Sequence, residues 1–181
     1  MKLRRLLLLL LTSFVSFLSI SQDLYDSNKD YLVWKQGYLL SWDSYKAEPD
    51  STLTSEYPAL TYVSFLPVGK AEDAKVVCVF DSKSSWTTSE SQSLLEHEQL
   101  HFDLGEVYAR RIRRDLQLLL SEGQLNEKSQ FDTIEKNYAL YSAEFQEYVD
   151  ATEHGMNKAQ QRLWFSNIAT ALRQLAEYQI D

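Results

Sequence analysis

The six residues Glu96–His101 constrain this chain more than any other stretch, because they place two histidines four residues apart in the pattern H-E-x-x-H. Residues four apart share one face of an α-helix, so His97 and His101 can direct their imidazole rings at one point if the stretch is helical. Two neutral imidazoles at that spacing can hold a zinc ion. Glu98 lies at the edge of the same face, where its carboxylate can take a proton from a metal-bound water. The stretch predicts a helix with a catalytic zinc site.

A catalytic zinc ion needs a third protein ligand and one open position for water. The extended motif H-E-x-x-H-x-x-G-x-x-H is absent, because positions 104 and 107 are leucine and valine rather than glycine and histidine. The chain has three histidines, and the one outside the motif is His154, where a second helix is expected to end. We therefore predict His154 as the third ligand and Glu153 as the alternative. Glu147 and Asp150 are weaker candidates.

The hydrophobic pattern of the motif helix indicates which of its faces is buried. At about 100° per residue, the stripe shared with the histidines also holds Leu94, Tyr108 and Ile112. Asp103 falls on the opposite side of the helix, and Glu106 also lies off the stripe. The histidine face is therefore expected to be the buried one, which excludes both acidic residues as ligands.

Gly105 lies one turn beyond His101 on the same stripe, where it costs the helix about 1 kcal/mol relative to alanine. A close approach of another backbone, such as the segment around His154, would explain the glycine. A tolerated helical glycine is the alternative.

The order of elements indicates an α+β fold. All three prolines lie at or before Pro67, so residues 22–88 are expected to be strand-rich and residues 89–181 helical. The apolar run 74–80 suits a strand buried on both faces, whereas 59–66 suits an edge strand on which an extended substrate could pair. We expect a zincin-like arrangement in which a small N-terminal sheet packs on a long motif helix, followed by two further C-terminal helices.

The helix bounds follow from capping signals. The motif helix is expected to run from residue 89 to about 121, with Ser89 and Gln92, or equally Thr87 and Glu90, as a capping box. Gly123 then provides the C-cap. A second helix is expected at about 128–153 and a third at about 157–178, where Asn157 is the N-cap.

The N-terminus resembles an export signal. Lys2, Arg4 and Arg5 precede an apolar run from Leu6 to Ile20, and a small-x-small site follows, so residues 1–21 predict a cleaved signal peptide. A retained membrane anchor is the alternative, but the run is somewhat short for a membrane span. The remaining 22–181 is expected to be one secreted or periplasmic domain without stable membrane insertion.

The charge of the chain limits its partners. Without the three basic residues of 1–21, the chain has 15 Lys and Arg against 26 Asp and Glu, a formal charge of −11. This excess of negative charge argues against a nucleic acid or an anionic membrane surface as a partner. The single Cys78 cannot form a disulfide within one chain and is expected to be a buried, inert side chain.

Three pieces of the sequence resemble a bacterial family known as domain of unknown function 922, whose members are described as secreted zinc-dependent proteases. They are Leu95–Arg114, which contains the motif, Leu40–Lys46 (Leu-Ser-Trp-Asp-Ser-Tyr-Lys), and Thr152–Gly155 (Thr-Glu-His-Gly). The second matches the family's Trp-Asp-x-Phe-Lys element with Tyr45 in place of phenylalanine. The resemblance implies a role for His154 beside His97 and His101, and further roles for Trp42 and Lys46.

These features predict a zinc metallopeptidase that hydrolyses peptide or protein substrates, with Glu98 as the general base. Tyr148 and Tyr108 are candidates for stabilising the oxyanion of the transition state. Two alternatives stay open at this point: a secreted binding protein that uses the same fold without turnover, and a hydrolase of cell-wall peptide bonds. The substrate and the oligomeric state do not follow from the sequence.

Overall fold

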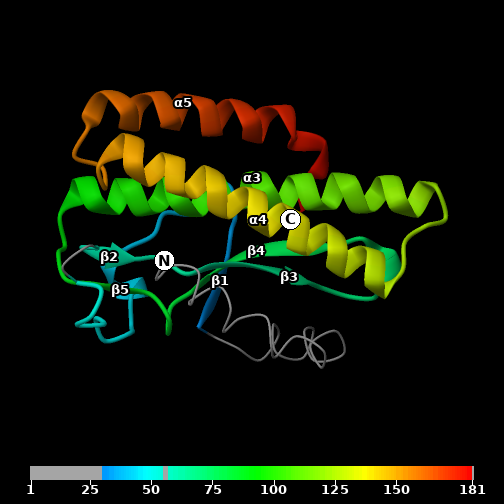
Figure 1. Cartoon of the computed structure of the whole chain (residues 1–181), viewed down its shortest axis with the longest axis horizontal. Helices are drawn as coiled ribbons and strands as arrows, with labels where there is room; N and C mark the ends of the chain where they lie inside the picture. Colours follow the sequence, from blue (N-terminus) through cyan, green and yellow to red (C-terminus); the bar gives the residue numbers. More distant parts are fainter. Residues whose placement is uncertain (1–29, 55–56, 181) are drawn as a thin grey trace.

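The computed structural model describes residues 30–54 and 57–180 and has an α+β fold in which a small sheet underlies three long helices (Figure 1). This confirms the expected order of a strand-rich part followed by a helical part. The strands are β1 (Tyr31–Val33), β2 (Ala59–Leu60), β3 (Val63–Pro67), β4 (Val76–Asp81) and β5 (Trp86–Thr87). The long helices are α3 (Gln92–Ser121), α4 (Glu127–Thr152) and α5 (Lys158–Gln174), and short 3-10 helices lie at Trp42–Ser44, Ala71–Asp73 and Ala176–Tyr178.

Strand β4 is the centre of a three-stranded antiparallel sheet in the order β1-β4-β3. Its first five residues are all buried, which confirms the expectation for the apolar run 74–80. The predicted edge strand at 59–66 is divided in two. Its first part is β2, which pairs with β5, and its second part begins β3, which is an edge strand among the described residues.

Helix α3 begins later than the capping signals predicted. Its N-cap is Ser91, whose side chain accepts a hydrogen bond from the backbone N–H of Leu94. Thr87 is part of β5, and its hydroxyl donates to the carbonyl of Ser89, so neither of the two predicted capping boxes forms. The other two helix starts agree closely with expectation: the Asn157 side chain caps α5, and Asn126 with Ser129 forms a capping box on α4.

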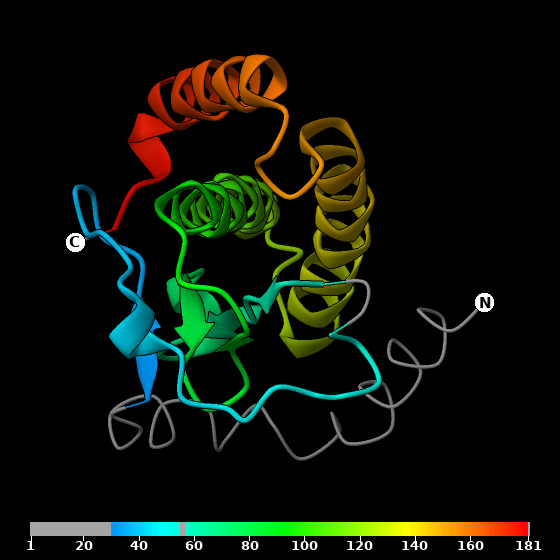
Figure 2. The ribbon, with the colours of Figure 1, turned by 90° about the vertical axis from the view of Figure 1, so that its left-hand side faces the viewer.

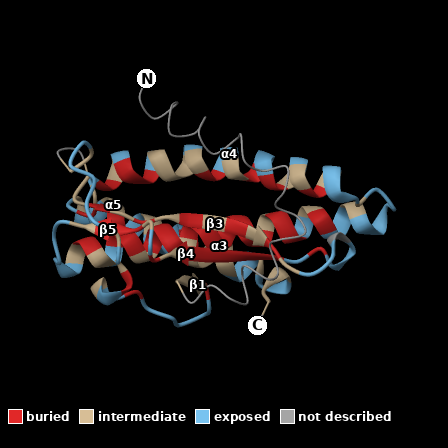
Figure 3. Cartoon of the chain, turned by 90° about the horizontal axis from the view of Figure 1, so that it is seen from below, coloured by how far each residue is buried: buried red, intermediate tan, exposed pale blue. Residues whose placement is uncertain are grey.

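Helix α3 is the core of the molecule rather than a helix with one buried face. Figure 2 shows it nearly end-on, with the sheet below it, α5 above it and α4 beside it. Its buried residues lie on several sides between His97 and Leu116 and include Glu106 and Arg110. Figure 3 shows buried residues along much of the helix. The side opposite the histidines is partly covered as well: Arg110 is buried and Asp103 half-buried, because β4 packs on one side of α3 while α4 and α5 pack on others.

Gly105 lets α3 approach the sheet. A Cβ atom at Gly105 would lie 2.6 Å from Cγ1 of Val63 and 2.9 Å from Sγ of Cys78, so any side chain there would clash. The expected close approach of the His154 segment is wrong at this position, since the neighbours are side chains of β3 and β4. Cys78 itself is fully buried, and burial raises the pKa of its thiol well above its usual value, as suits an inert core residue.

The predicted signal peptide at 1–21 lies outside the described residues. Within residues 30–54 and 57–180, no helix combines the length and the apolar character that a membrane span requires.

Candidate metal centre

The motif residues lie in the first half of α3 and are nearly inaccessible. His97 is 1% exposed, Glu98 4% and His101 4%, which confirms that this face of the helix is buried. The two imidazole rings face α4, whose Tyr141, Phe145 and Tyr148 stack on them, whereas Glu98 lies beside Thr61. The histidine rings therefore lie between two consecutive helices, the first half of α3 and the second half of α4.

The chain reverses direction directly after α4 and brings His154 to His97. Glu153, His154 and Gly155 follow one another in the left-handed region, with φ of 50°, 53° and 80°. This places the His154 ring edge-to-face with the His97 ring, with 5.9 Å between ring centroids. Left-handed conformations at two non-glycine residues each cost about 1–2 kcal/mol. Strain of this kind persists only where the surrounding contacts hold it.

The residues on either side of His154 also contact His97. A Cβ atom at Gly155 would lie 2.9 Å from Cβ of His97 and 2.9 Å from the carbonyl oxygen of Ser93, so only glycine fits there. The hydroxyl of Thr152 lies 3.2 Å from Nδ1 of His97. The same hydroxyl donates to the carbonyl of Tyr148, at 2.7 Å.

His101 has a different environment. Its Nε2 lies 2.5 Å from the hydroxyl oxygen of Tyr141, and its ring stacks on Phe145 with 3.6 Å between centroids. Its Nδ1 faces Oε2 of Glu98 at 3.8 Å, which is too long for a hydrogen bond. Among the described residues, this buried Nδ1 has no hydrogen-bond partner.

The electrostatics favour neutral imidazoles beside a carboxylate. Burial lowers the pKa of His97 to about 4 and also lowers the pKa of His101, because desolvation penalises the charged ring. Burial alone would raise the pKa of Glu98, but its contacts with His101, His97 and the Thr61 hydroxyl hold that pKa below its usual value. At neutral pH the site thus consists of uncharged nitrogen donors and one anion.

The predicted ligands are only partly brought together. His154 lies against His97, whereas His101 is turned toward Tyr141. Within the described parts of the chain, no group of three or more His, Cys, Asp or Glu side chains is arranged to hold a metal ion as it stands. The alternative ligand Glu153, and the weaker candidates Glu147 and Asp150, are all exposed.

The two acidic residues excluded as ligands have other partners. Asp103 accepts hydrogen bonds from the indole of Trp34 and the side-chain amide of Gln99. Glu106 accepts hydrogen bonds from two buried arginines further along α3. Neither carboxylate faces the motif histidines, in agreement with the prediction from helix geometry.

The two tyrosines expected to stabilise an oxyanion form hydrogen bonds within the fold. The Tyr148 hydroxyl donates to the backbone carbonyl of His97 and lies 3.3 Å from Oε1 of Gln161, and the Tyr108 hydroxyl donates to Glu144. Both hydroxyl groups thus have structural partners, and a role at an oxyanion stays a prediction for each.

Sequence reasoning missed two residues that contact the motif directly, Tyr141 and Phe145. The signal was present, because residues 141, 145, 148 and 152 follow the spacing of four, three and four that lines one face of a helix. These three aromatic residues and a threonine line the face of α4 that covers the site. The last of them, Thr152, is two residues before His154.

The segment 40–46 reaches the site indirectly. The Tyr45 ring is tilted against Trp42 and edge-to-face with Phe80. Its hydroxyl lies 2.6 Å from the hydroxyl of Thr61, which is itself beside Glu98. Lys46 forms an exposed ion pair with Asp30, 3.1 Å apart. Packing accounts for Trp42, and an ion pair away from the histidines accounts for Lys46.

Comparison of the chain with models of protein families, with curated proteins and with solved structures finds no match in any of the three.

Proposed function

We propose that this protein is an exported, zincin-like metallopeptidase in which His97, His101 and His154 bind zinc and Glu98 is the general base. The observation that carries the proposal is the turn at 152–155. Three of its four residues lie against His97. Thr152 approaches it with its hydroxyl and His154 with its imidazole ring, and Gly155 lies so close that a side chain there would clash with it. A turn strained in this way, closing on a motif histidine, is typical of a site that must hold a ligand in place.

The donor set fits a zinc ion in chemistry. Three imidazoles, two of them buried with lowered pKa values, match the preference of zinc for neutral nitrogen ligands. Binding at all three residues requires the ring of His101 to exchange its contact with Tyr141 for the metal.

The residues of the chain then have distinct roles. When bound, zinc would polarise a substrate carbonyl and lower the pKa of a water molecule. Glu98, held as a carboxylate, would accept a proton from the attacking water and return it to the leaving amine. Strand β3 offers an unpaired edge, among the described residues, to which an extended peptide could add as a further strand.

Two variants test this proposal. Zinc content, measured by mass spectrometry on purified protein, should approach one ion per chain for the wild type and fall to background for His97→Ala. Hydrolysis of an unfolded protein substrate should be lost in Glu98→Gln, which should keep its zinc because the glutamate is not a ligand. Background zinc in the wild type would exclude the proposal, and equal hydrolysis by wild type and Glu98→Gln would exclude Glu98 as the base.

A second candidate is a secreted binding protein without catalysis. One observation favours it: Nε2 of His101 is already engaged by Tyr141, and the motif residues are almost inaccessible. This candidate predicts that neither the wild type nor Glu98→Gln cleaves any peptide, including peptides of the cell wall.

A further inference from the structure

The hydroxyl of Thr152 fixes the protonation of His97. A threonine hydroxyl has one hydrogen to donate, and that of Thr152 is directed at the carbonyl oxygen of Tyr148. Toward His97 the hydroxyl oxygen can therefore only accept, so Nδ1 of His97 must bear the proton. A neutral imidazole protonated at Nδ1 has its lone pair at Nε2. That lone pair is the position that a metal would take, and the side chain of Gln161 is a second hydrogen-bonding neighbour of the His97 ring.

His101 is also protonated at Nδ1, for a different reason, but the lone pair at its Nε2 already accepts a hydrogen bond. The Glu98 carboxylate lies on the Nδ1 side of the ring and favours a proton there, which leaves the lone pair at Nε2. The Tyr141 hydroxyl lies 2.5 Å from that Nε2 and has no other hydrogen-bond partner in the described part of the chain. A tyrosine hydroxyl is protonated at neutral pH, so it donates its hydrogen to the unprotonated Nε2.

We propose that Thr152 and Tyr141 set the zinc affinity of the site in opposite directions, an inference that rests on the function proposed above. Thr152 is a positioning residue that keeps the Nε2 lone pair of His97 free for the metal. Tyr141 is an intramolecular competitor that occupies the Nε2 lone pair of His101 until the metal displaces it. The metal-free site is thereby closed by its own hydrogen bond, and zinc binding must first break that bond.

Zinc affinities measured by competition with a chromophoric chelator test the two roles. Tyr141→Phe removes the competing hydroxyl and should bind zinc about 5- to 10-fold more tightly, from the net value of one hydrogen bond. Thr152→Val removes the acceptor for Nδ1 and should bind zinc about 10- to 100-fold more weakly, as is usual when the partner of a ligating histidine is lost.

Matched controls come from the same helix. Tyr138→Phe alters a tyrosine that contacts the ring of Tyr141 but has no contact with a histidine in the described residues. Thr133→Val removes a hydroxyl that donates to a carbonyl one turn earlier, as Thr152 does, but far from the site. Both controls should bind zinc like the wild type. Unchanged or weaker binding by Tyr141→Phe would overturn the role of Tyr141, and unchanged binding by Thr152→Val would overturn that of Thr152.

A second readout does not need the metal. Nitrogen-15 NMR of the metal-free protein distinguishes the two imidazole tautomers, and three histidines are few enough to assign by substitution. His97 and His101 should both be protonated at Nδ1, and His97 should lose this preference in Thr152→Val. Protonation of His101 at Nε2 would overturn the competitor role. Correct tautomers in a wild type that binds no zinc would instead exclude the proposed function, so the two failures are distinguishable.

Discussion

Helix α3 contains two buried polar clusters, and their difference separates a structural role from a functional one. The motif cluster (His97, Glu98 and His101) lies in its first half, and the arginine cluster (Glu106, Arg110 and Arg113) lies one turn and more beyond it. Both clusters are buried to a similar extent. They differ in how their polar atoms are partnered.

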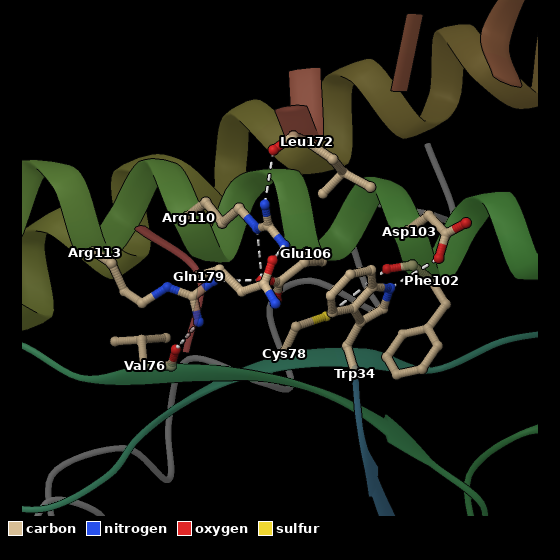
Figure 4. A network of polar contacts seen from close by, with 10 residues as sticks. All are labelled: Trp34, Val76, Cys78, Phe102, Asp103, Glu106, Arg110, Arg113, Leu172 and Gln179. Carbon is tan, nitrogen blue, oxygen red and sulfur yellow. Dashed lines mark hydrogen bonds and ion pairs between the residues drawn. The ribbon is translucent and has the colours of Figure 1, made fainter. Parts of the chain in front are cut away.

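The arginine cluster is held by fixed partners from three parts of the fold (Figure 4). Glu106 accepts from both arginines, at 2.9 Å and 2.5 Å. Arg113 also donates to the carbonyl of Val76 on β4. Arg110 donates to the carbonyl of Leu172 in α5 and to the side chain of Gln179, so the cluster joins the sheet, α3 and the C-terminal segment. One N–H of Arg113 is without a partner among the described residues.

The motif cluster has no comparable set of partners. Its carboxylate lies 3.8 Å from the nearest imidazole nitrogen, and its rings face hydroxyl groups and aromatic rings rather than backbone carbonyls. Buried polar groups that are fully paired rigidify a core, whereas incompletely paired ones are costly unless they serve a ligand. The comparison therefore supports a structural role for the arginine cluster and the proposed role of the motif cluster in binding a ligand.

The largest expected effect comes from removing the shared anion of the arginine cluster. Glu106→Gln leaves two buried guanidinium groups without a counter-charge and should lower the free energy of unfolding by about 3–5 kcal/mol. The matched change Glu98→Gln should cost about 1 kcal/mol or less, because its carboxylate has no close ion-pair partner to leave unpaired. Urea denaturation in the presence of a chelator measures both. Equal losses would remove the distinction between the two clusters.

A smaller effect is expected at the turn that completes the motif cluster. Gly155→Ala combines a left-handed backbone with a clash against His97 and Ser93, and should cost about 2–4 kcal/mol. Gly123→Ala is the matched control, since Gly123 has a similar φ of +68° but nothing within 4 Å of a Cβ atom there. It should cost about 1 kcal/mol, from the backbone conformation alone. A cost at Gly155 no greater than at Gly123 would show that the turn is not closed on His97.

The smallest effect is a pH dependence of the metal-free protein. The unfolded chain binds a proton at His97 near pH 6.5, whereas the folded chain binds it only near pH 4. The unfolded state therefore gains protons first as the pH falls, and the free energy of unfolding decreases by about 2 kcal/mol between pH 7 and pH 5. His101, whose pKa is also lowered, adds a change of the same sign.

The control for this prediction is His97→Asn, which has no titrating group at that position. Urea titrations at pH 7, 6 and 5 with a chelator should show a shallower decline for the variant than for the wild type. Parallel declines would mean that His97 titrates normally and is not desolvated.

Sequence patterns predicted the parts of this molecule that depend on local chemistry. The spacing of His97 and His101 predicted a helix, and three helices with nearly the expected bounds are present. The continuous apolar run predicted the buried central strand β4. The coincidence of a helix end with the remaining histidine pointed to His154, which does lie against His97.

The parts that failed depend on tertiary contacts. Glu106 and Arg110 look like residues of a solvated helix face, and only the packing of three elements around α3 turns them into a buried network. Four hydroxyl residues and Glu90 precede α3, so propensity alone could not select Ser91 as its cap. Tyr141 was not identified because its importance lies in one hydrogen bond to a residue 40 positions earlier.

The central claim is that His97 and His101 of α3 converge on one metal ion with His154 from the turn after α4. X-ray absorption spectroscopy at the zinc edge of the purified wild-type protein tests it most directly. The account predicts three imidazole nitrogens at about 2.0–2.1 Å from zinc, and one fewer in His154→Ala. A spectrum with two imidazoles or fewer in the wild type, or an unchanged spectrum in His154→Ala, would contradict it.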